Sequence, residues 1–411
     1  MNPKNTIVPS HSWQSKKRLL YLSGALRVST RPQATVGGAR AHVLGVIKAF
    51  RNLHWQVSSF IAGDLVRLPW VTRSFDRATR SGPVKRMAAD LVRLLCGFLF
   101  ALVAARKCRH ADWVYERAGS FKNLGSRCKK KGVPWILESN ALIFEEAFLD
   151  RRTIYFYRLA KKKEIEAYRS CDALVCVSEG LKERIVAASG IDPKKAVVVP
   201  NGVDVDFFNP DIQPAKRFFK ELTIGFVGTM YAWQGLHLLL EALVGLLRDG
   251  FKPKLVLAGD GPELDSLRRQ AGSLNLTKDV HFSGRVEWHD IPAYIAGFDI
   301  GYSGQIATES GDWYGSPIKI YELMAMGKPV IASAFEDARR VIVDGQNGYL
   351  FQPGNSSALQ GSLKNAFQHK ENWPAMGRLA RREIEVSCTW TARVNAMIPQ
   401  IEYILGKNGN L

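Results

Sequence analysis

The feature that most constrains the fold of this chain is the alternation of short apolar segments with amphipathic segments of helical period. The alternation occurs twice, before and after a loop-like stretch at residues 204–221 that contains Pro210 and Pro214. Parallel strands need a crossover connection, usually a helix, so this pattern is typical of a parallel sheet covered on both faces. We therefore predict an α/β protein with two doubly wound, Rossmann-like domains.

The expected elements can be placed along the chain. Strands are predicted at residues 19–24, 56–62, 112–117, 133–140, 173–177, 197–203, 222–228, 254–258, 280–286, 299–303 and 329–333. In the first half, helices are predicted at residues 37–53, 84–106, 120–131 and 144–169, and a further helix is predicted to begin at Ser178 and Glu179. In the second half, helices are predicted at residues 236–248 and 291–297, and helices fill residues 355–406 at the end of the chain.

The length and the apolar runs of the chain indicate its number of domains and its cellular compartment. A chain of 411 residues is long enough for two domains, each with its own core. Residues 1–18 lack the apolar region of a secretory signal, so we expect the protein to stay in the cytosol. The longest strongly apolar run, Leu94–Ala105, has about twelve residues against the roughly 20 that span a bilayer, so we expect no transmembrane helix.

The six cysteines have no zinc-binding spacing and no Cys-x-x-Cys pair. They are Cys96, Cys108, Cys128, Cys171, Cys176 and Cys388. We expect reduced thiols with mostly structural roles, and no metal site.

The net charge of +19 is confined to one half of the chain. Residues 1–210 contain 36 Lys and Arg against 17 Asp and Glu, whereas residues 211–411 contain 21 of each. Anionic lipid, nucleic acid or a phosphorylated substrate could face such a basic half. Residues 65–86 interleave Arg and Lys with apolar and aromatic residues, which suits an interfacial contact but also an ordinary solvated loop and helix.

A short helix in residues 311–333 carries an unusual cation. Ser316 suits the N-cap and Pro317 the first helical position. Lys319 then falls in the first turn, where the helix dipole disfavours a cation, and Glu322 follows on the same face. This arrangement suits a phosphate held by backbone N–H groups and a lysine, with a carboxylate for hydroxyl groups. A core-packed helix with a solvated lysine is the alternative.

Two features of the first half point to a ligand crevice. Gly37 and Gly38 open a helix after a strand, which lets backbone approach a ligand closely. Glu138 and Asn140 lie at the end of a predicted strand, and ligands collect at the carboxyl ends of parallel strands. We therefore expect both side chains to face the crevice.

The second half closely resembles the donor-binding domain of retaining glycosyltransferases with the GT-B fold, specifically family 4. The matching segments are residues 226–229, 234–236, 258–263, 282–286, 316–322, 325–332 and 347–348. The first half is similar more loosely, through Gly37-Gly38 with His42, residues 115–117, 134–141, 177–178 and 199–204.

The resemblance implies a domain organisation. Residues 1–205 would form the acceptor-side domain, residues 206–388 the nucleotide-sugar donor domain, and residues 389–411 a terminal helix that returns to the first domain. The two domains would face each other across a cleft, with the nucleotide mainly on the second and no metal or cofactor required.

The resemblance also implies a set of site residues. The nucleotide-sugar contacts would be Gly38, Gly228, Thr229, Gln234, Gly284, Arg285, Val286, Tyr314, Ser316, Ile318, Lys319 and Glu322. Gly38 would approach the diphosphate, residues 284–286 would border the base, and Glu322 would hold ribose hydroxyls. Catalytic roles would fall to Lys319, Glu322, Asn140 and Glu138.

The chain departs from the family pattern at four of these positions. Thr229 and Gln234 stand where the family has two cations for the diphosphate. Tyr314 replaces the first glutamate of the E-x7-E motif, and Asn140 replaces a common histidine. Lys319 is then the remaining cation for the phosphates.

The function implied is a cytoplasmic, metal-independent, retaining hexosyltransferase, peripheral on the inner face of the membrane. It would move a hexose from a UDP- or GDP-type sugar to a glycan or lipid-linked acceptor of polysaccharide or lipopolysaccharide synthesis. An anionic membrane surface is a further expected partner, and nucleic acid is not. The alternatives are a nucleotide-sugar epimerase or a phosphorylase of the same two-domain plan, and a catalytically silent nucleotide-sugar binder.

Overall fold

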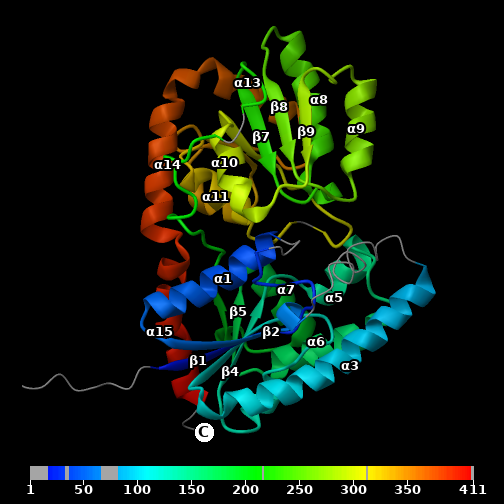
Figure 1. Ribbon diagram of the computed structural model, residues 1–411, viewed down its shortest axis with the longest axis vertical. Coiled ribbons are helices and arrows are strands. Elements are labelled where there is room, and N and C mark those ends of the chain that lie inside the picture. The colour runs from blue at the N-terminus through cyan, green and yellow to red at the C-terminus, as the bar shows by residue number, and fades with distance from the viewer. Residues whose placement is uncertain (1–16, 33–36, 66–81, 215–216, 312, 409–411) are drawn as a thin grey trace, which may run out of the picture.

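Two lobes, one above the other in Figure 1, make up the protein. The computed structural model describes residues 17–32, 37–65, 82–214, 217–311 and 313–408. Within these residues each lobe is built on a six-stranded sheet, and every strand pair in both sheets is parallel. The predicted α/β architecture with two doubly wound sheets is confirmed.

The first sheet has the strand order β2-β1-β3-β4-β5-β6. Its strands are β1 (Arg18–Ser23), β2 (Gln56–Ile61), β3 (Trp113–Arg117), β4 (Trp135–Ser139), β5 (Ala173–Cys176) and β6 (Ala196–Val198). Alternate residues of β1 enter different cores, because successive side chains point to opposite faces: Leu19 and Tyr21 belong to one buried cluster, and Leu20 and Leu22 to another. Both faces of this sheet are therefore covered.

The helices of the first lobe divide between these two faces. They are α1 (Gly37–Asn52), α3 (Pro83–Lys107), α4 (Ser126–Lys129), α5 (Ile143–Glu145), α6 (Tyr157–Ser170) and α7 (Glu179–Ser189), with short turns η1 (Ala62–Leu65), η3 (Cys108–His110), η4 (Glu146–Asp150) and η5 (Pro193–Lys195). α1 covers one face, and the other helices pack on the opposite face.

Two helices predicted in this lobe are wrong in extent. The helix predicted at residues 144–169 is interrupted, because the backbone N–H groups of Tyr155 and Phe156 donate to the buried Asp90 carboxylate, at 2.8 and 2.9 Å, instead of to a preceding turn. The helix predicted at residues 120–131 is reduced to the single turn α4. There Phe121 has a positive φ of 59°, and the buried Glu116 side chain accepts the N–H of Leu124 at 2.9 Å.

The second sheet has the strand order β12-β11-β10-β7-β8-β9. Its strands are β7 (Thr223–Val227), β8 (Lys254–Ala258), β9 (Val280–Gly284), β10 (Ile300–Ser303), β11 (Val330–Ser333) and β12 (Tyr349–Phe351). Its helices are α8 (Leu236–Arg248), α9 (Leu264–Ser273), α10 (Ile291–Ala296), α11 (Ile318–Ala325), α12 (Glu336–Val341), α13 (Ser356–Gln368) and α14 (Trp373–Ser387), with turns η6 (Ala232–Gln234), η7 (Trp288–Asp290) and η8 (Lys370–Asn372).

The last helix crosses back to the first lobe. α15 (Trp390–Asn408) follows α14 and lies beside α1 at the first sheet (Figure 1). Trp390, Val394 and Met397 belong to the same buried cluster as Val43 and Val46 of α1. The chain thus ends on the lobe in which it began.

Helix α3 agrees with the helix predicted at residues 84–106, but its apolar part is longer than the run Leu94–Ala105, on which the expectation of no transmembrane helix rested. Within the described residues, Pro83–His110 is one helical segment that is long and apolar enough, by length and composition alone, to cross a membrane. Most of the basic segment 65–86, predicted to make an interfacial contact, lies outside the described residues, which include only Leu65 and residues 82–86 of it. The six cysteines are free thiols, and five of them are buried.

Candidate active site

Two loops meet where the strand order of the second sheet reverses. β7 lies between β8 and β10, and ligands of open parallel sheets bind at the carboxyl ends of the strands at such a point. Gly228 directly follows β7, and Gln234 ends the same loop. Gln305 follows β10, and its Nε2 donates to Oε1 of Gln234 at 3.3 Å. This contact ties the two loops together at the reversal point.

The amine of Lys319 lies at this same point. Lys319 is the second residue of α11, and its Nζ donates to Oε1 of Gln234 at 2.5 Å. The same Nζ is 4.1 Å from the centre of the Phe226 ring and 3.7 Å from where a Cβ on Gly228 would stand. Gln234 occupies the position of one of the family's diphosphate cations, so the structure brings a different cation to that position.

Lys319 and Glu322 share a region of low polarity. Burial of the amine lowers the pKa of Lys319 to about 7, although the charge of Glu322 acts in the opposite direction. Burial likewise raises the pKa of Glu322 to about 7, against the charge of Lys319, and Glu322 is only 8% exposed. The whole Lys319 side chain is partly exposed, whereas its amine packs against the Phe226 ring. A bound anion would restore the charge of this amine.

Glycines let the backbone segments of this region touch. Gly228 has a φ of 139° and Gly259 a φ of 147°, and a Cβ on Gly259 would stand 1.9 Å from the Gly228 carbonyl oxygen. Gly259 N in turn donates to the carbonyl of Gly284 at 2.8 Å. No atom lies within 4 Å of a Cβ built on Gly284, which has a φ of 69°. The predicted contacts Gly228 and Gly284 are therefore neighbours, with open space beside Gly284.

Three other predicted nucleotide contacts lie on the same edge of the second sheet. Thr229 follows Gly228 and is exposed. Arg285 follows β9 and pairs with Glu287, with 3.2 Å between Nε and Oε1. Val286 packs on the buried cluster beneath α11.

The glycine pair of the first lobe abuts the second lobe. A Cβ on Gly37 would stand 3.5 Å from Cδ1 of Trp288, whereas no atom of a described residue lies within 4 Å of one on Gly38. The Arg40 guanidinium lies 4.5 Å from the centre of the Trp288 ring. Sequence reasoning missed Arg40 and Trp288, because their contact joins residues far apart in the chain.

Ser316 is not the N-cap of α11. The helix begins at Ile318, and Pro317 is the cap residue, with no side-chain cap hydrogen bond. The Ser316 hydroxyl donates instead to Asp337 at 2.9 Å and accepts the backbone N–H of Asn201 at 3.0 Å. Ile318 packs against the core cluster of the first lobe. The start of α11 is thus held between the lobes.

Glu138 belongs to the interior of the first lobe. It is 3% exposed, and its Oε1 is 2.7 Å from Nε2 of His42, whose Nδ1 is 2.8 Å from Oδ1 of Asn201. Burial raises the pKa of Glu138, but His42 and Arg117 outweigh it and hold the pKa below its usual value. The expectation that Glu138 faces the transferred sugar is corrected, because its carboxylate is enclosed by His42.

Asn140 lies one residue beyond β4 and is partly exposed. Its Nδ2 is enclosed and has no hydrogen-bond partner among the described residues. Asn140 thus follows β4 with a side chain that is partly exposed and an amide nitrogen that is buried without a partner in the described part of the chain.

Tyr314, at the position of the family's first glutamate, contacts the first lobe. Its hydroxyl accepts the backbone N–H of Leu142 at 3.3 Å, and the Arg184 guanidinium lies 4.8 Å from its ring centre. Its carbonyl accepts the Ser178 hydroxyl. Tyr314 therefore joins the lobes.

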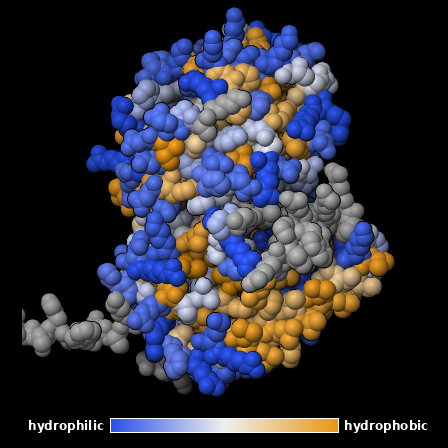
Figure 2. Space-filling view, viewed as in Figure 1, coloured by the Kyte–Doolittle hydropathy of each residue, from blue (hydrophilic) through white to orange (hydrophobic). Residues whose placement is uncertain are grey.

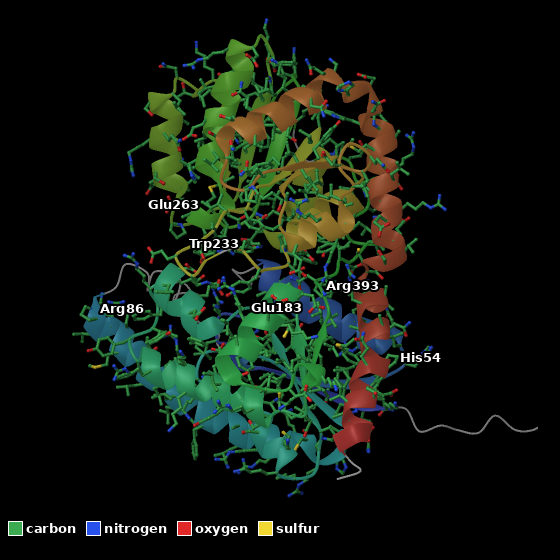
Figure 3. The ribbon with its side chains drawn as sticks, turned by 180° about the vertical axis from the view of Figure 1, so that it is seen from behind. His54, Arg86, Glu183, Trp233, Glu263 and Arg393 are labelled. Carbon is green, nitrogen blue, oxygen red and sulfur yellow. The ribbon has the colours of Figure 1, made fainter. Side chains whose placement is uncertain are left out.

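An aromatic pair and an arginine also meet where the lobes face each other. Tyr231 and Trp233 stack with ring centres 4.1 Å apart, and the Arg151 guanidinium lies 5.8 and 5.9 Å from them. Figure 3 shows Trp233 at the level between the lobes. Nearby, Asp150 accepts the Ser310 hydroxyl at 3.0 Å. The sequence carried no signal for these contacts across the lobes.

No group of three or more His, Cys, Asp or Glu side chains in the described part of the chain could hold a metal ion. A surface depression of about 570 Å³ lies elsewhere, where Val197 of β6 faces Tyr403 of α15. None of the residues that line it is a predicted nucleotide contact, so we place the candidate site at the reversal point of the second sheet and not there.

Comparisons with known families agree with this geometry. Residues 36–207 match Glycosyltransferase Family 4, and residues 209–383 match Glycosyl transferases group 1. The chain is 24% identical over 277 residues to an uncharacterized glycosyltransferase of Methanocaldococcus jannaschii, covering 65% of this chain and 67% of that one. It is 32% identical over 219 residues to a phosphatidyl-myo-inositol mannosyltransferase of Mycobacterium leprae, covering 52% and 55%. The second match spans only about half of the relative's length.

Solved structures share the whole architecture. An Anabaena protein, HepE, in complex with UDP and glucose aligns with a TM-score of 0.67 and 18% identity, covering 94% of this chain and all of that one. Sucrose-phosphate synthase from Thermosynechococcus elongatus aligns with a TM-score of 0.68 and 15% identity over 95% of this chain. The chain has the GT-B fold, with two parallel sheets and a last helix that returns to the first lobe. Because family matches cover both lobes, the chain belongs to glycosyltransferase family 4.

Proposed function

We propose that this chain is a retaining hexosyltransferase that needs no metal ion or other cofactor and uses a UDP- or GDP-type sugar as donor. The observation that carries the proposal is the Lys319 amine at the reversal point of the second sheet, against Gln234 and beside Gly228. A cation and close backbone at this place suit a diphosphate. Glu322, one turn along α11, suits the ribose hydroxyls.

Lys319 would act mainly on the leaving group. As the bond between the anomeric carbon and the diphosphate oxygen breaks, negative charge grows on the diphosphate, and a fixed cation in a region of low polarity lowers the barrier. The acceptor oxygen would attack from the face that the diphosphate leaves, and its proton would pass to the departing phosphate oxygen. Asn140, which directly follows β4, would hold a hydroxyl of the transferred sugar.

The acceptor proposed is a lipid-linked or cell-surface glycan precursor at the inner face of the membrane. The excess positive charge lies in residues 1–210, which form the acceptor side, and suits an anionic lipid or a phosphorylated precursor. Among the relatives, the Mycobacterium leprae protein is named for mannosyl transfer to phosphatidyl-myo-inositol. Another, from Escherichia coli, is named as a putative colanic acid biosynthesis glycosyltransferase and is 25% identical over 276 residues.

Thermal unfolding with a panel of nucleotide sugars and nucleoside diphosphates tests the donor. A ligand at about 100 times its dissociation constant stabilises the folded state by roughly 2.7 kcal/mol, so one base should stand out. Donor turnover with a chelator present then tests the reaction. Conversion of the donor to an isomeric nucleotide sugar would indicate an epimerase, and stabilisation without turnover a silent binder. Absence of stabilisation by every nucleotide would refute the proposed donor site.

A further inference from the structure

The outward side of α3 is apolar along nearly its whole length. Seven large side chains, spaced mostly three or four residues apart, are each at least 36% exposed: Val84, Met87, Leu91, Val92, Leu95, Phe98 and Leu99. We call these seven residues the α3 apolar face. In Figure 2 the corresponding surface of the lower lobe is a continuous apolar band. Single exposed apolar residues are normal on proteins, but a continuous band of this kind marks an interaction surface.

The opposite side of α3 is fixed to the first lobe. Asp90 is fully buried, and its carboxylate accepts two backbone N–H groups and pairs with Arg93 at 2.5 Å. A Cβ on Gly97 would stand only 2.6 Å from the backbone oxygen of Phe121, so the helix lies directly on that loop. A helix that crosses a bilayer would have to leave these contacts and expose the Asp90 carboxylate to lipid. The contacts therefore favour a helix that lies along a surface.

The charges around the apolar face have one sign. Asp90 is the only acidic residue of α3, and its side chain is buried. Cations stand at both ends of the helix, Lys85 and Arg86 at the start and Arg106 and Lys107 at the end. Over residues 82–131 the chain has twelve Lys and Arg against three Asp and Glu. A basic rim around an apolar stripe complements an anionic bilayer, in which lipid tails take the stripe and head groups take the rim.

The position of α3 also links it to the contact between the lobes. Arg93 donates to the backbone oxygen of Thr153 at 2.8 Å. The neighbouring Arg152 reaches Glu309 of the second lobe at 3.1 Å, so the residues held by α3 border the contact between the lobes. Figure 3 shows Arg86, near the start of α3, close to the level at which the lobes meet.

We propose that the α3 apolar face inserts into the surface of an anionic lipid bilayer, with α3 parallel to the membrane plane. A bilayer bound to the α3 apolar face would present a lipid-linked acceptor near the contact between the lobes. That role for the membrane rests on the proposed function, whereas the binding to the bilayer does not. The sequence placed the membrane contact in residues 65–86, and the structure extends it to α3.

Vesicle binding by the full chain tests the proposal without any donor or acceptor. Wild-type protein should co-sediment with vesicles of phosphatidylglycerol and phosphatidylcholine, bind less as salt rises, and bind pure phosphatidylcholine more weakly. Leu91→Glu/Phe98→Glu should lower the partition coefficient roughly 100-fold or more, because two large apolar side chains leave the lipid. The matched control is Leu379→Glu/Val386→Glu, with the same spacing on α14 and side chains 52% and 72% exposed. The control should bind as wild type does.

Three results would overturn the proposal: equal loss of binding in both double variants, a dimer in place of vesicle binding, and insertion to the bilayer centre. Equal loss in both double variants would mean that added negative charge alone weakens binding. A wild-type dimer in solution that only the α3 variant dissociates, without vesicle binding, would assign the face to a second copy. A nitroxide at Leu95→Cys, in a Cys96→Ser background, should lie about 5–10 Å below the head groups, and a depth near the bilayer centre would indicate a spanning helix. Donor turnover with a soluble acceptor, if the proposed function holds, should not change in the α3 variant.

Discussion

Binding of a nucleotide sugar above neutral pH should draw a proton into the protein at Lys319. The pKa of Lys319 is lowered to about 7 by burial of its amine, so at about pH 8 roughly ten of eleven molecules carry it uncharged. A diphosphate within hydrogen-bond reach favours the charged form and raises this pKa again. Each unit of that rise contributes about 1.4 kcal/mol to binding.

The expected magnitudes follow from this pKa. Near pH 8 the uptake should approach about 0.9 proton per donor bound, and near pH 6 it should fall to about 0.1. The dissociation constant should rise about tenfold per pH unit above about pH 7, because the neutral amine must first be protonated. Ribose hydroxyls that donate to Glu322 would lower its pKa of about 7, and because this carboxyl is already mostly ionised at pH 8, it would release little proton there.

Calorimetric titration in buffers of different ionisation enthalpy measures this uptake directly. A nucleotide sugar is the right ligand, because neither of its phosphates titrates near neutral pH. Lys319→Met should abolish the uptake and flatten the pH dependence of affinity. Lys328→Met is the control, since burial also lowers the pKa of Lys328, but its Nζ donates to Ala296 O at 2.9 Å. Nearly a full proton taken up by Lys319→Met would refute the reasoning, and so would no uptake by wild type.

Three further changes test the structural roles of named side chains. Asp90→Ala should lower the free energy of unfolding by about 3–5 kcal/mol, because it leaves Arg93 without its buried partner carboxylate. Urea titrations measure this, and a loss below about 1 kcal/mol would contradict the anchoring of α3. Burial raises the pKa of Glu116 to about 7, so its carboxyl binds more protons in the folded state than in the unfolded state. Glu116 should therefore contribute a fall in stability of up to about 3 kcal/mol between about pH 4.5 and 7, and Glu116→Gln should reduce the measured fall by that amount in chemical unfolding at several pH values. Tyr314→Phe should cost about 1 kcal/mol of stability and leave donor turnover within about twofold, whereas a large loss of turnover would place its hydroxyl on the donor.

Local pattern was enough to predict most strands, the course of α1 and α8, and the start of α7. α7 illustrates why: Ser178 accepts the N–H of Leu181 at 3.1 Å, and Gly190 ends the helix with a left-handed φ of 68°, so both signals lie within the segment itself. The strands were predicted from equally local patterns, because a strand that is buried on both faces is a short continuous run of apolar residues in the sequence.

The predictions that were wrong concern residues whose contacts lie far away in the chain. Ser316 had the local chemistry of an N-cap, but its hydroxyl donates to Asp337, 21 residues on. The helix predicted at residues 144–169 was interrupted by Asp90, 65 residues before Tyr155. Glu138 was expected in the cleft, yet His42, from another helix, encloses it. In each case a polar group made a long-range contact that sequence spacing does not encode.

The displaced N-cap has a consequence for the site. Because Ser316 bonds to Asn201 and Asp337, the chain three residues before Lys319 is held by both lobes at once. His42 links Asn201 to Glu138 of β4, two residues before Asn140. A change in how the lobes meet would therefore move the start of α11, and with it the Lys319 amine, relative to Gln234. The contact between the lobes therefore helps to set the position of the Lys319 amine, the group proposed to meet the diphosphate.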